Sequence, residues 1–144
     1  MSITIEGTDE IEKILARLAP NHAKNLMRAT VHGVASEITK KAKQKVPVDT
    51  GNLKKSLKTK RRRGKPGKPV SEVIADTGQG AKNDGFYWYF VEYGTRDGRP
   101  EQPFMRPARD DVFSKLDTVI EQQFTKKLAA AIKRQMKRQA KLNV

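Results

Sequence analysis

Six of the nine aromatic residues in this chain fall within eight positions, in the run Phe86–Tyr93. Aromatic residues favour β-strands, in which successive side chains point to opposite faces. A strand here would be largely apolar on both faces, with Tyr87, Tyr89, Val91 and Tyr93 on one and Phe86, Trp88, Phe90 and Glu92 on the other. We therefore predict a strand that is either enclosed in the core, or packed on helices of its own chain while its other face meets a second subunit.

Helical spacing of apolar residues predicts a long helix on each side of this strand. The first spans about 21–45, and Pro47 stops it. Its apolar face would hold Met27, Val31, Val34, Ile38 and Ala42. The second begins near Arg106 and continues towards the C-terminus, with an apolar stripe that thins beyond Ala130. The end of this helix would extend past the folded body and be free to meet a neighbour.

Shorter elements are expected before and between the long helices. Leu53 and Leu57 would anchor a short turn of helix that Asp49 or Thr50 caps, with Gly51 allowing the tight start. Other expected elements are a short strand at 3–5, a helix at 8–18 and a strand at 70–77. The expected fold is α+β, a small antiparallel sheet of three to four strands packed by a long N-terminal helix and a long C-terminal helix.

Charge divides the chain into a near-neutral body and two basic segments. The formal net charge is +14, yet residues 54–68 hold nine Lys or Arg and no acid, and residues 126–141 hold seven and no acid. We expect 1–125 to form one domain with a mobile basic loop, or hairpin tip, at 58–69. Residues 126–144 would form a basic helical extension. This distribution favours contact with a polyanion or with an acidic protein surface.

Catalytic and metal-binding patterns are weak. The chain has no cysteine, and its two histidines, His22 and His32, lie ten positions apart and read as ordinary helix residues. The triplet Asp-Thr-Gly of aspartic proteases occurs at Asp49 and Asp76, but a two-lobed enzyme needs a much longer chain, so both triplets read as caps or turns. We expect no enzyme, no cofactor and no metal site. With no apolar run of about 18 residues and no signal peptide pattern, the protein is expected to be soluble, made in a cytoplasm and not bound to a membrane.

Three motifs occur in a defined order and spacing. They are Val46-Pro-x-Asp-Thr-Gly-x-Leu-x-x-Ser56, Tyr89-Phe-Val-Glu-Tyr-Gly-Thr95 and Gln102-Pro-Phe-Met-Arg-Pro-Ala108. Together they resemble the tail-completion, or head–tail joining, family of long-tailed double-stranded DNA phages. The resemblance covers roughly residues 8–125. The basic residues 58–68 and the segment after 126 lie outside the matching pattern.

The resemblance implies a non-enzymatic structural protein of the virion neck or tail, assembled in the host cytoplasm. Such subunits form homo-oligomeric rings that join the tail to the DNA-filled head, between the neck connector and the tail terminator or tail-tube proteins. DNA passes through the central opening. The matched residues would act as determinants of fold and assembly: Pro47, Asp49, Thr50, Gly51, Leu53, Glu92, Tyr93, Gly94, Thr95, Pro103, Phe104, Met105 and Pro107.

An alternative function is a small basic DNA-binding module. Cations on a flexible segment neutralise phosphates and give binding that depends on salt but not on base sequence. The same cations would serve equally well as a contact with an acidic partner protein. The candidate contact residues are Lys58, Lys60, Arg61, Arg62, Arg63, Lys65, Lys133, Arg134, Lys137 and Arg138.

Overall fold

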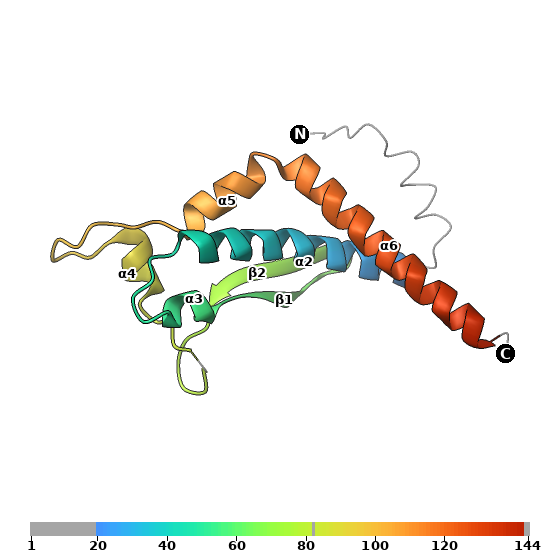
Figure 1. Cartoon of the computed structure of the whole chain (residues 1–144), viewed down its shortest axis with the longest axis horizontal. Helices are drawn as coiled ribbons and strands as arrows, with labels where there is room; N and C mark the ends of the chain where they lie inside the picture. The colour runs from blue at the N-terminus through green and yellow to red at the C-terminus, as the bar shows by residue number, and fades with distance from the viewer. Residues whose placement is uncertain (1–19, 82, 143–144) are drawn as a thin grey trace.

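The computed structural model describes residues 20–81 and 83–142, so the strand predicted at 3–5 and the helix predicted at 8–18 lie outside the described residues. The elements in order are α2 (Pro20–Lys45), α3 (Asn52–Ser56), β1 (Leu57–Lys65), β2 (Lys68–Ala75), α4 (Trp88–Tyr93), α5 (Met105–Phe113) and α6 (Leu116–Leu142). Helix α2 lies at the centre, the β1–β2 hairpin packs along it, and α5 and α6 cover another side (Figure 1).

Helix α2 confirms the first predicted long helix. It begins at a proline, which suits a first helical position, and it ends before Pro47. Its buried residues include Thr30 and Thr39, whose hydroxyls donate to the carbonyls four residues earlier at 2.8 and 3.1 Å. Small, internally satisfied residues let other elements approach the helix closely. The predicted apolar face is correct at Ala42, which is buried, and wrong at Met27, which is exposed.

The basic segment predicted as a loop forms a β-strand instead. Strand β1 pairs antiparallel with β2 in a register that runs from Leu57 opposite Ala75 to Arg62 opposite Val70. Most of β1 is exposed, so its cations remain solvated while the backbone pairs with β2. The alternative of a hairpin tip fits 66–67, where the chain turns. Within the described residues the sheet has two strands, so the prediction of three to four strands was wrong.

The aromatic run is a helix, not a strand. Helix α4 leaves Tyr89, Phe90 and Tyr93 exposed, as is Phe86 in the turn before it, and Tyr87 at the N-cap lies inwards with Trp88, Val91 and Glu92. Residues at i, i+3, i+4 and i+7 share one face of a helix, which matches the exposed set. Tyr87, Trp88 and Val91 pack against the core. The strand prediction failed because these tertiary contacts outweigh a local β-propensity.

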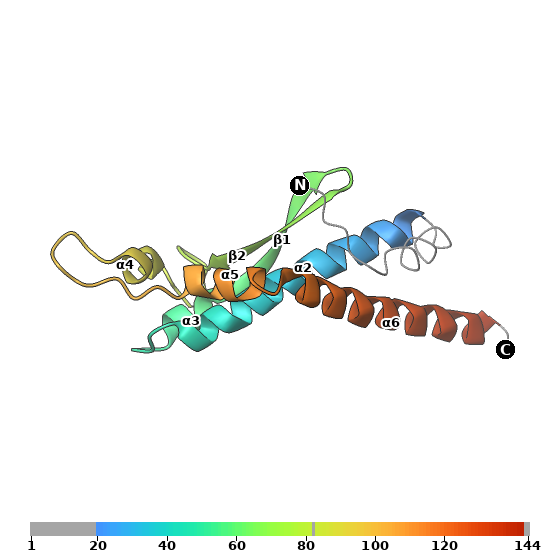
Figure 2. The same ribbon diagram turned by 90° about the horizontal axis from the view of Figure 1, so that it is seen from above.

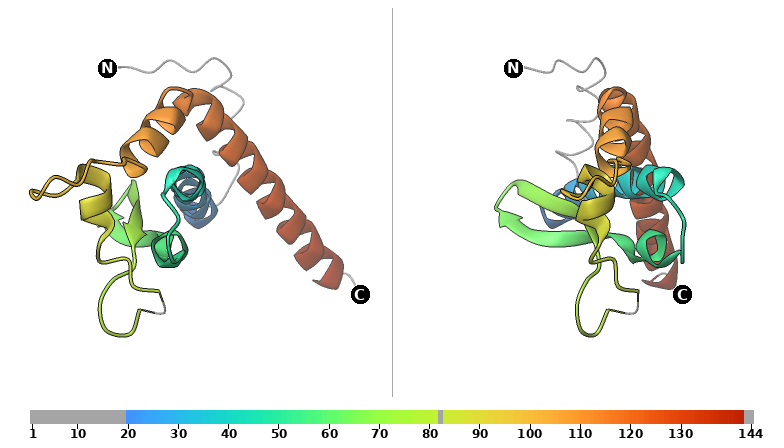
Figure 3. Two further views of the ribbon diagram at one scale, coloured as in Figure 1. Left: turned by 60° about the vertical axis from the view of Figure 1, so that its left-hand side comes forward. Right: turned by 90° about the vertical axis from the view of Figure 1, so that its left-hand side faces the viewer.

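The long C-terminal helix is broken in two. Helix α5 ends at Phe113, and turn hydrogen bonds from the Ser114 and Lys115 amides to carbonyls of the last turn of α5 precede α6. Figure 3 shows the two helices meeting at an angle above α2. Helix α6 then runs back along α2, where the Gln135 side-chain amide lies 3.0 Å from Nδ1 of His22.

The core lies at one end of the molecule, where α2, α3 and α5 meet. Its fully buried members are Ala42, Val46, Leu53, Leu57, Phe104 and Ala108. The predicted anchoring of the short helix by Leu53 and Leu57 is therefore confirmed. At the opposite end, α6 contains no buried residue along its length, and its C-terminal end extends beyond the other described elements (Figures 1 and 2).

Candidate functional site

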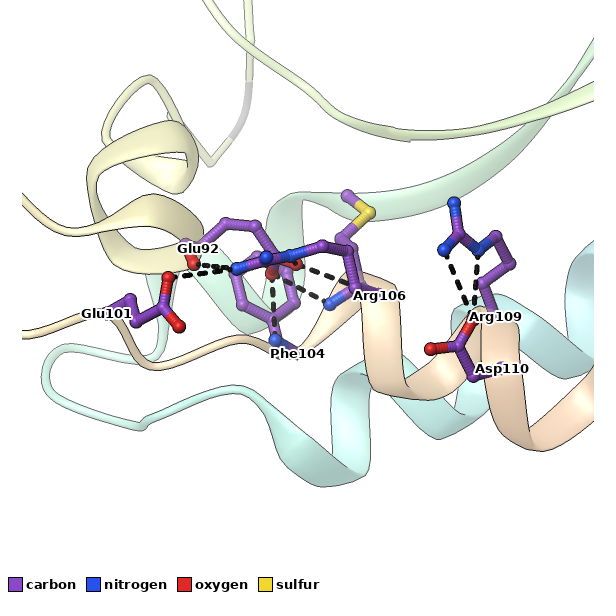
Figure 4. Close-up of polar contacts among 7 residues, drawn as sticks. Glu92, Glu101, Phe104, Arg106, Arg109 and Asp110 are labelled. Atoms are coloured by element: carbon purple, nitrogen blue, oxygen red, sulfur yellow. Dashed lines mark hydrogen bonds and ion pairs between the residues drawn. The ribbon is translucent and has the colours of Figure 1, made fainter.

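The carboxylate of Glu92 holds the start of α5. The side chain is 1% exposed, and its oxygens accept hydrogen bonds from the backbone amides of Phe104, Met105 and Arg106 at 2.8, 2.9 and 3.0 Å (Figure 4). These amides begin a helix, where N–H groups lack partners within the helix and the dipole favours negative charge. Glu92 therefore caps α5 from a distant position in the sequence.

Arg106 completes this junction from its partly exposed side. Its Nε donates to Glu92 at 2.9 Å, one terminal nitrogen donates to the Glu92 carbonyl at 2.8 Å, and its guanidinium lies 4.6 Å from the centre of the Tyr93 ring. Burial alone would raise the pKa of the Glu92 carboxyl. The three backbone amides and the guanidinium outweigh burial and hold that pKa below its ordinary value of 4.5.

The loop between α4 and α5 is closed by Gly94 and Thr95. Gly94 has φ 75° and ψ 179°, a conformation that residues with a Cβ rarely adopt, and a Cβ there would lie 2.8 Å from the Arg99 carbonyl oxygen. The Thr95 amide donates to the Arg99 carbonyl at 3.1 Å, and the Gln102 amide donates to the Val91 carbonyl at 2.8 Å. These contacts bring the chain back so that Phe104 meets Glu92.

The first motif joins the same region through the core. The N-cap of α3 is Gly51, with φ 81°, and not Asp49 or Thr50 as predicted. The backbone amide of Leu53 donates a hydrogen bond to the hydroxyl of Tyr87, in the aromatic run, at 3.1 Å. Because Leu53 and Phe104 belong to one buried cluster, the three sequence motifs meet in space.

Comparison with known protein families gives a match over residues 9–94 to a family described as "Bacteriophage HK97-gp10, putative tail-component". The chain belongs to this HK97 gp10-like family. The match includes the first motif and the second up to Gly94, and the third motif, at 102–108, follows it. No curated protein and no solved structure matches the chain. Family membership places the protein among structural components of the phage tail, and hence in the virion.

The exposed side of α4, together with Phe86 in the turn before it, forms an aromatic face made of Phe86, Tyr89, Phe90 and Tyr93. Their exposed fractions are 65%, 55%, 53% and 47%. Tyr89 links the three rings on the helix, with its ring centroid 4.7 Å from that of Tyr93 and 6.4 Å from that of Phe90. Large exposed aromatic side chains grouped on one surface are typical of protein interfaces. The sequence located this cluster, but its helical face was missed because the run was interpreted as a strand.

A basic concavity of about 560 Å³ lies between the hairpin tip and the first half of α2. Of the predicted cations, Arg61, Arg62, Arg63 and Lys65 line it. Lys24 and Arg28 of α2 line it as well, and sequence reasoning missed them because they lie outside the basic segments. The described residues that line this concavity include no acid. Predicted cations Lys58 and Lys60 lie on β1 outside its lining, and Lys58 pairs with Asp76 at 2.7 Å.

A second hollow, the α2–α6 groove, has a volume of about 510 Å³. Its apolar lining comprises Leu26, Ala29, Leu128, Ala131, Ile132 and Met136. The cations that line it are Arg61 of β1 and Lys127, Arg134 and Arg138 of α6. The structure thus brings Arg61 of one basic segment to Arg134 and Arg138 of the other, whereas Lys133 and Lys137 are exposed outside this lining. Burial, followed by the positive charges of Arg61 and Lys127, lowers the pKa of His32 below 6.5.

The remaining sequence candidates have structural positions. Asp49 is exposed before α3, and Asp76 follows β2 beside Lys58. His22 and His32 lie on α2 and contact Gln135 and Ser71 respectively. Among residues 20–81 and 83–142, no group of three or more His, Asp or Glu side chains is placed to hold a metal ion. No helix in this part of the chain is long and apolar enough to cross a membrane.

Proposed function

We propose that this protein is a tail-completion, or head–tail connector, subunit that forms a ring at the phage neck and joins the tail to the DNA-filled head. Membership in a phage tail-component family supports a structural role at this site. The observation that carries the ring is the aromatic face, because its four large rings, on α4 and in the turn before it, remain about half exposed or more in the described chain. Repeated copies burying such a surface most often close into symmetric oligomers.

The neighbours above and below the ring would be the neck connector and the tail terminator or tail-tube proteins. The hydrogen bonds around Glu92 and the shared core of the three motifs hold α3, α4 and α5 together in each subunit. The aromatic face and the α2–α6 groove lie outside that core and are available for contacts between subunits. Scaffolding, without chemistry, is the mechanism.

A phage that lacks this protein tests the proposal. We expect electron micrographs of such lysates to contain DNA-filled heads beside complete but unattached tails. Supplying the protein from a plasmid should restore joined particles. Particles that are joined normally without the protein, or lysates that contain no tail tubes at all, would contradict a role in completing and joining the tail.

The basic concavity supports contact with DNA as a second function. Seven cations line it: Lys24, Arg28, Arg61, Arg62, Arg63, Lys65 and Lys68. Side chains from two separate elements converge there, which a solvated loop alone would not produce. A concave surface of this charge suits a phosphate backbone that is contacted without regard to base sequence.

Lys24 and Arg28 give the sharper test because they lie outside the basic segments. The double variant K24A/R28A should bind double-stranded DNA more weakly, and its plot of log affinity against log salt should be shallower by about 2 if each cation meets one phosphate. The matched control is K54A/K55A, which removes the same charge from exposed positions on α3. Equal losses in both variants would mean that net charge alone, and not the concavity, attracts DNA.

A further inference from the structure

We propose that the aromatic face of α4 docks into the α2–α6 groove of a second copy of this chain. The inference rests on the proposed ring and names the two surfaces that would build it. One surface is exposed and aromatic, and the other is a hollow with apolar and basic lining residues. Both surfaces occur on every subunit. Each copy therefore presents a knob, the aromatic face, at one end and a socket, the α2–α6 groove, near the other.

The apolar chemistry of the two surfaces is complementary. The groove is floored by Leu26, which is buried, and it also exposes Ile132 and Met136, which are 48% and 66% accessible. Aromatic rings bury about 150–250 Å² each and make favourable contacts with methionine sulfur. A volume of about 510 Å³ falls within the range of sites that enclose ligand-sized groups, so it suits two or three ring side chains.

Charge favours the same pairing. In the segment that carries the aromatic face, Glu92 is buried against Arg106 and Asp76 pairs with Lys58. Its exposed charged side chains among the described residues are Asp84, Asp97, Glu101, Arg96 and Arg99, so this end is near neutral against a strongly basic remainder of the chain. The described residues that line the groove contribute Arg61, Lys127, Arg134 and Arg138 and no acid. The rings themselves also attract guanidinium groups, as the position of Arg106 over Tyr93 demonstrates within one subunit.

Geometry excludes the same contact within one copy. Helix α4 lies at one end of the molecule and the C-terminal half of α6 reaches the other (Figure 1). The aromatic face of a subunit therefore cannot reach its own groove. A contact between two different surfaces is heterologous, and its repetition closes into a ring when the rotation between neighbours permits it.

Absence of cysteine from the chain makes the docking directly testable. Single-cysteine variants Phe90→Cys and Met136→Cys are mixed and treated with a short thiol cross-linker. We expect cross-linked dimers in the mixture at about tenfold or more the yield of either variant alone, because specific docking raises the local concentration of the two thiols. Glu121→Cys, at an exposed position on α6, replaces Met136→Cys in the control mixture and should give only the background yield.

Two loss-of-contact variants test the direction of the contact. Y89S/F90S removes the knob, and I132S/M136S removes the socket, at exposed positions where folding should survive. Each variant alone should associate about 10- to 100-fold more weakly than the unmodified chain, since buried aromatic anchors dominate interfaces. Mixed together, they should form one-to-one dimers that grow no further, because only one intact knob and one intact socket remain.

Other outcomes overturn the docking. Association of I132S/M136S alone would mean that the aromatic faces pair with each other, and association of Y89S/F90S alone would mean that the α6 helices pair. No specific cross-link would mean that the aromatic face does not dock into the groove of a second copy. The micrographs of phage that lack the protein test the proposed function independently. Detached heads and tails in those micrographs, combined with no specific cross-link, would reject this interface but support the head–tail role.

Discussion

The α4–α5 junction and the C-terminal half of α6 differ in how far their side chains are buried and bonded within the subunit. At the junction a carboxylate that is 1% exposed receives hydrogen bonds from three backbone amides and an arginine. Helix α6 has no buried residue, and Met136 near its end is 66% exposed. The first region contributes stability to a single subunit, and the second has apolar surface that the described residues leave uncovered. Our proposal thus assigns stability and assembly to different ends of the chain.

Removing the Glu92 carboxylate should have the largest effect on a single subunit. Glu92→Ala leaves three amides at the start of α5 without their acceptor and takes the partner from Arg106, and we expect a loss of about 3 kcal/mol or more in the free energy of unfolding. Urea denaturation followed by circular dichroism measures it. The control Glu121→Ala removes an exposed carboxylate from α6 and should change stability by less than about 0.5 kcal/mol. Equal losses of stability in the two variants would contradict the claim that the junction, and not α6, stabilises the subunit.

The backbone at Gly94 should be nearly as sensitive. Gly94→Ala places a Cβ 2.8 Å from the Arg99 carbonyl oxygen in an unfavourable conformation, and we expect a cost of about 2–3 kcal/mol. Gly98→Ala is matched to it, because Gly98 belongs to the same loop and has φ 99°, but a Cβ there meets nothing within 4 Å. Its cost should be about 1 kcal/mol, from conformation alone. A Gly94 variant no less stable than the Gly98 variant would contradict the close approach in this loop.

Acid should weaken the junction through the same carboxylate. The pKa of Glu92 in the folded chain lies below its ordinary value of 4.5, so its stabilisation is fully present above pH 4.5 and is lost as the pH falls towards the folded-state pKa. Urea unfolding of the unmodified chain and of Glu92→Gln between pH 3 and 7 measures this. The difference in stability between the two should be constant near neutrality and should narrow below pH 4.5. A constant difference across the whole range would show that the charge of Glu92 is not what stabilises α5.

Sequence reasoning located α2 and the short helix well, because both depend on local signals. The proline at each boundary and the spacing of apolar residues fixed α2 to within a residue, and Leu53 with Leu57 anchored α3. The aromatic run failed because its composition favours a strand, while tertiary packing of Trp88 and Val91 selects a helix. A signal was present in the chain: Phe86, Tyr89, Phe90 and Tyr93 repeat at helical spacing.

The site was less predictable than the fold. Glu92 was identified within a motif, but its role requires Phe104, Met105 and Arg106 to lie opposite it, and no local pattern specifies that contact. The strand character of β1 was hidden because a basic, exposed strand gains its order from pairing with β2 and carries no apolar alternation of its own. Lys24 and Arg28 were likewise missed, since only the fold brings them to the hairpin tip.

Shortening α6 should have the smallest effect on the stability of a single subunit. It therefore gives the strictest test of the difference between α6 and the α4–α5 junction. A chain that ends after Gln135 keeps the contact with His22 but lacks Met136 and Arg138. Because the removed residues within the described chain are exposed, we expect the free energy of unfolding to change by less than about 1 kcal/mol. Self-association, followed by sedimentation velocity across a concentration series, should fall because one wall of the α2–α6 groove is shortened. A loss of stability above about 2 kcal/mol would mean that the end of α6 unfolds together with the rest of the subunit and contributes to its stability. In that case the exposed apolar residues of α6 would no longer be evidence for a neighbouring subunit.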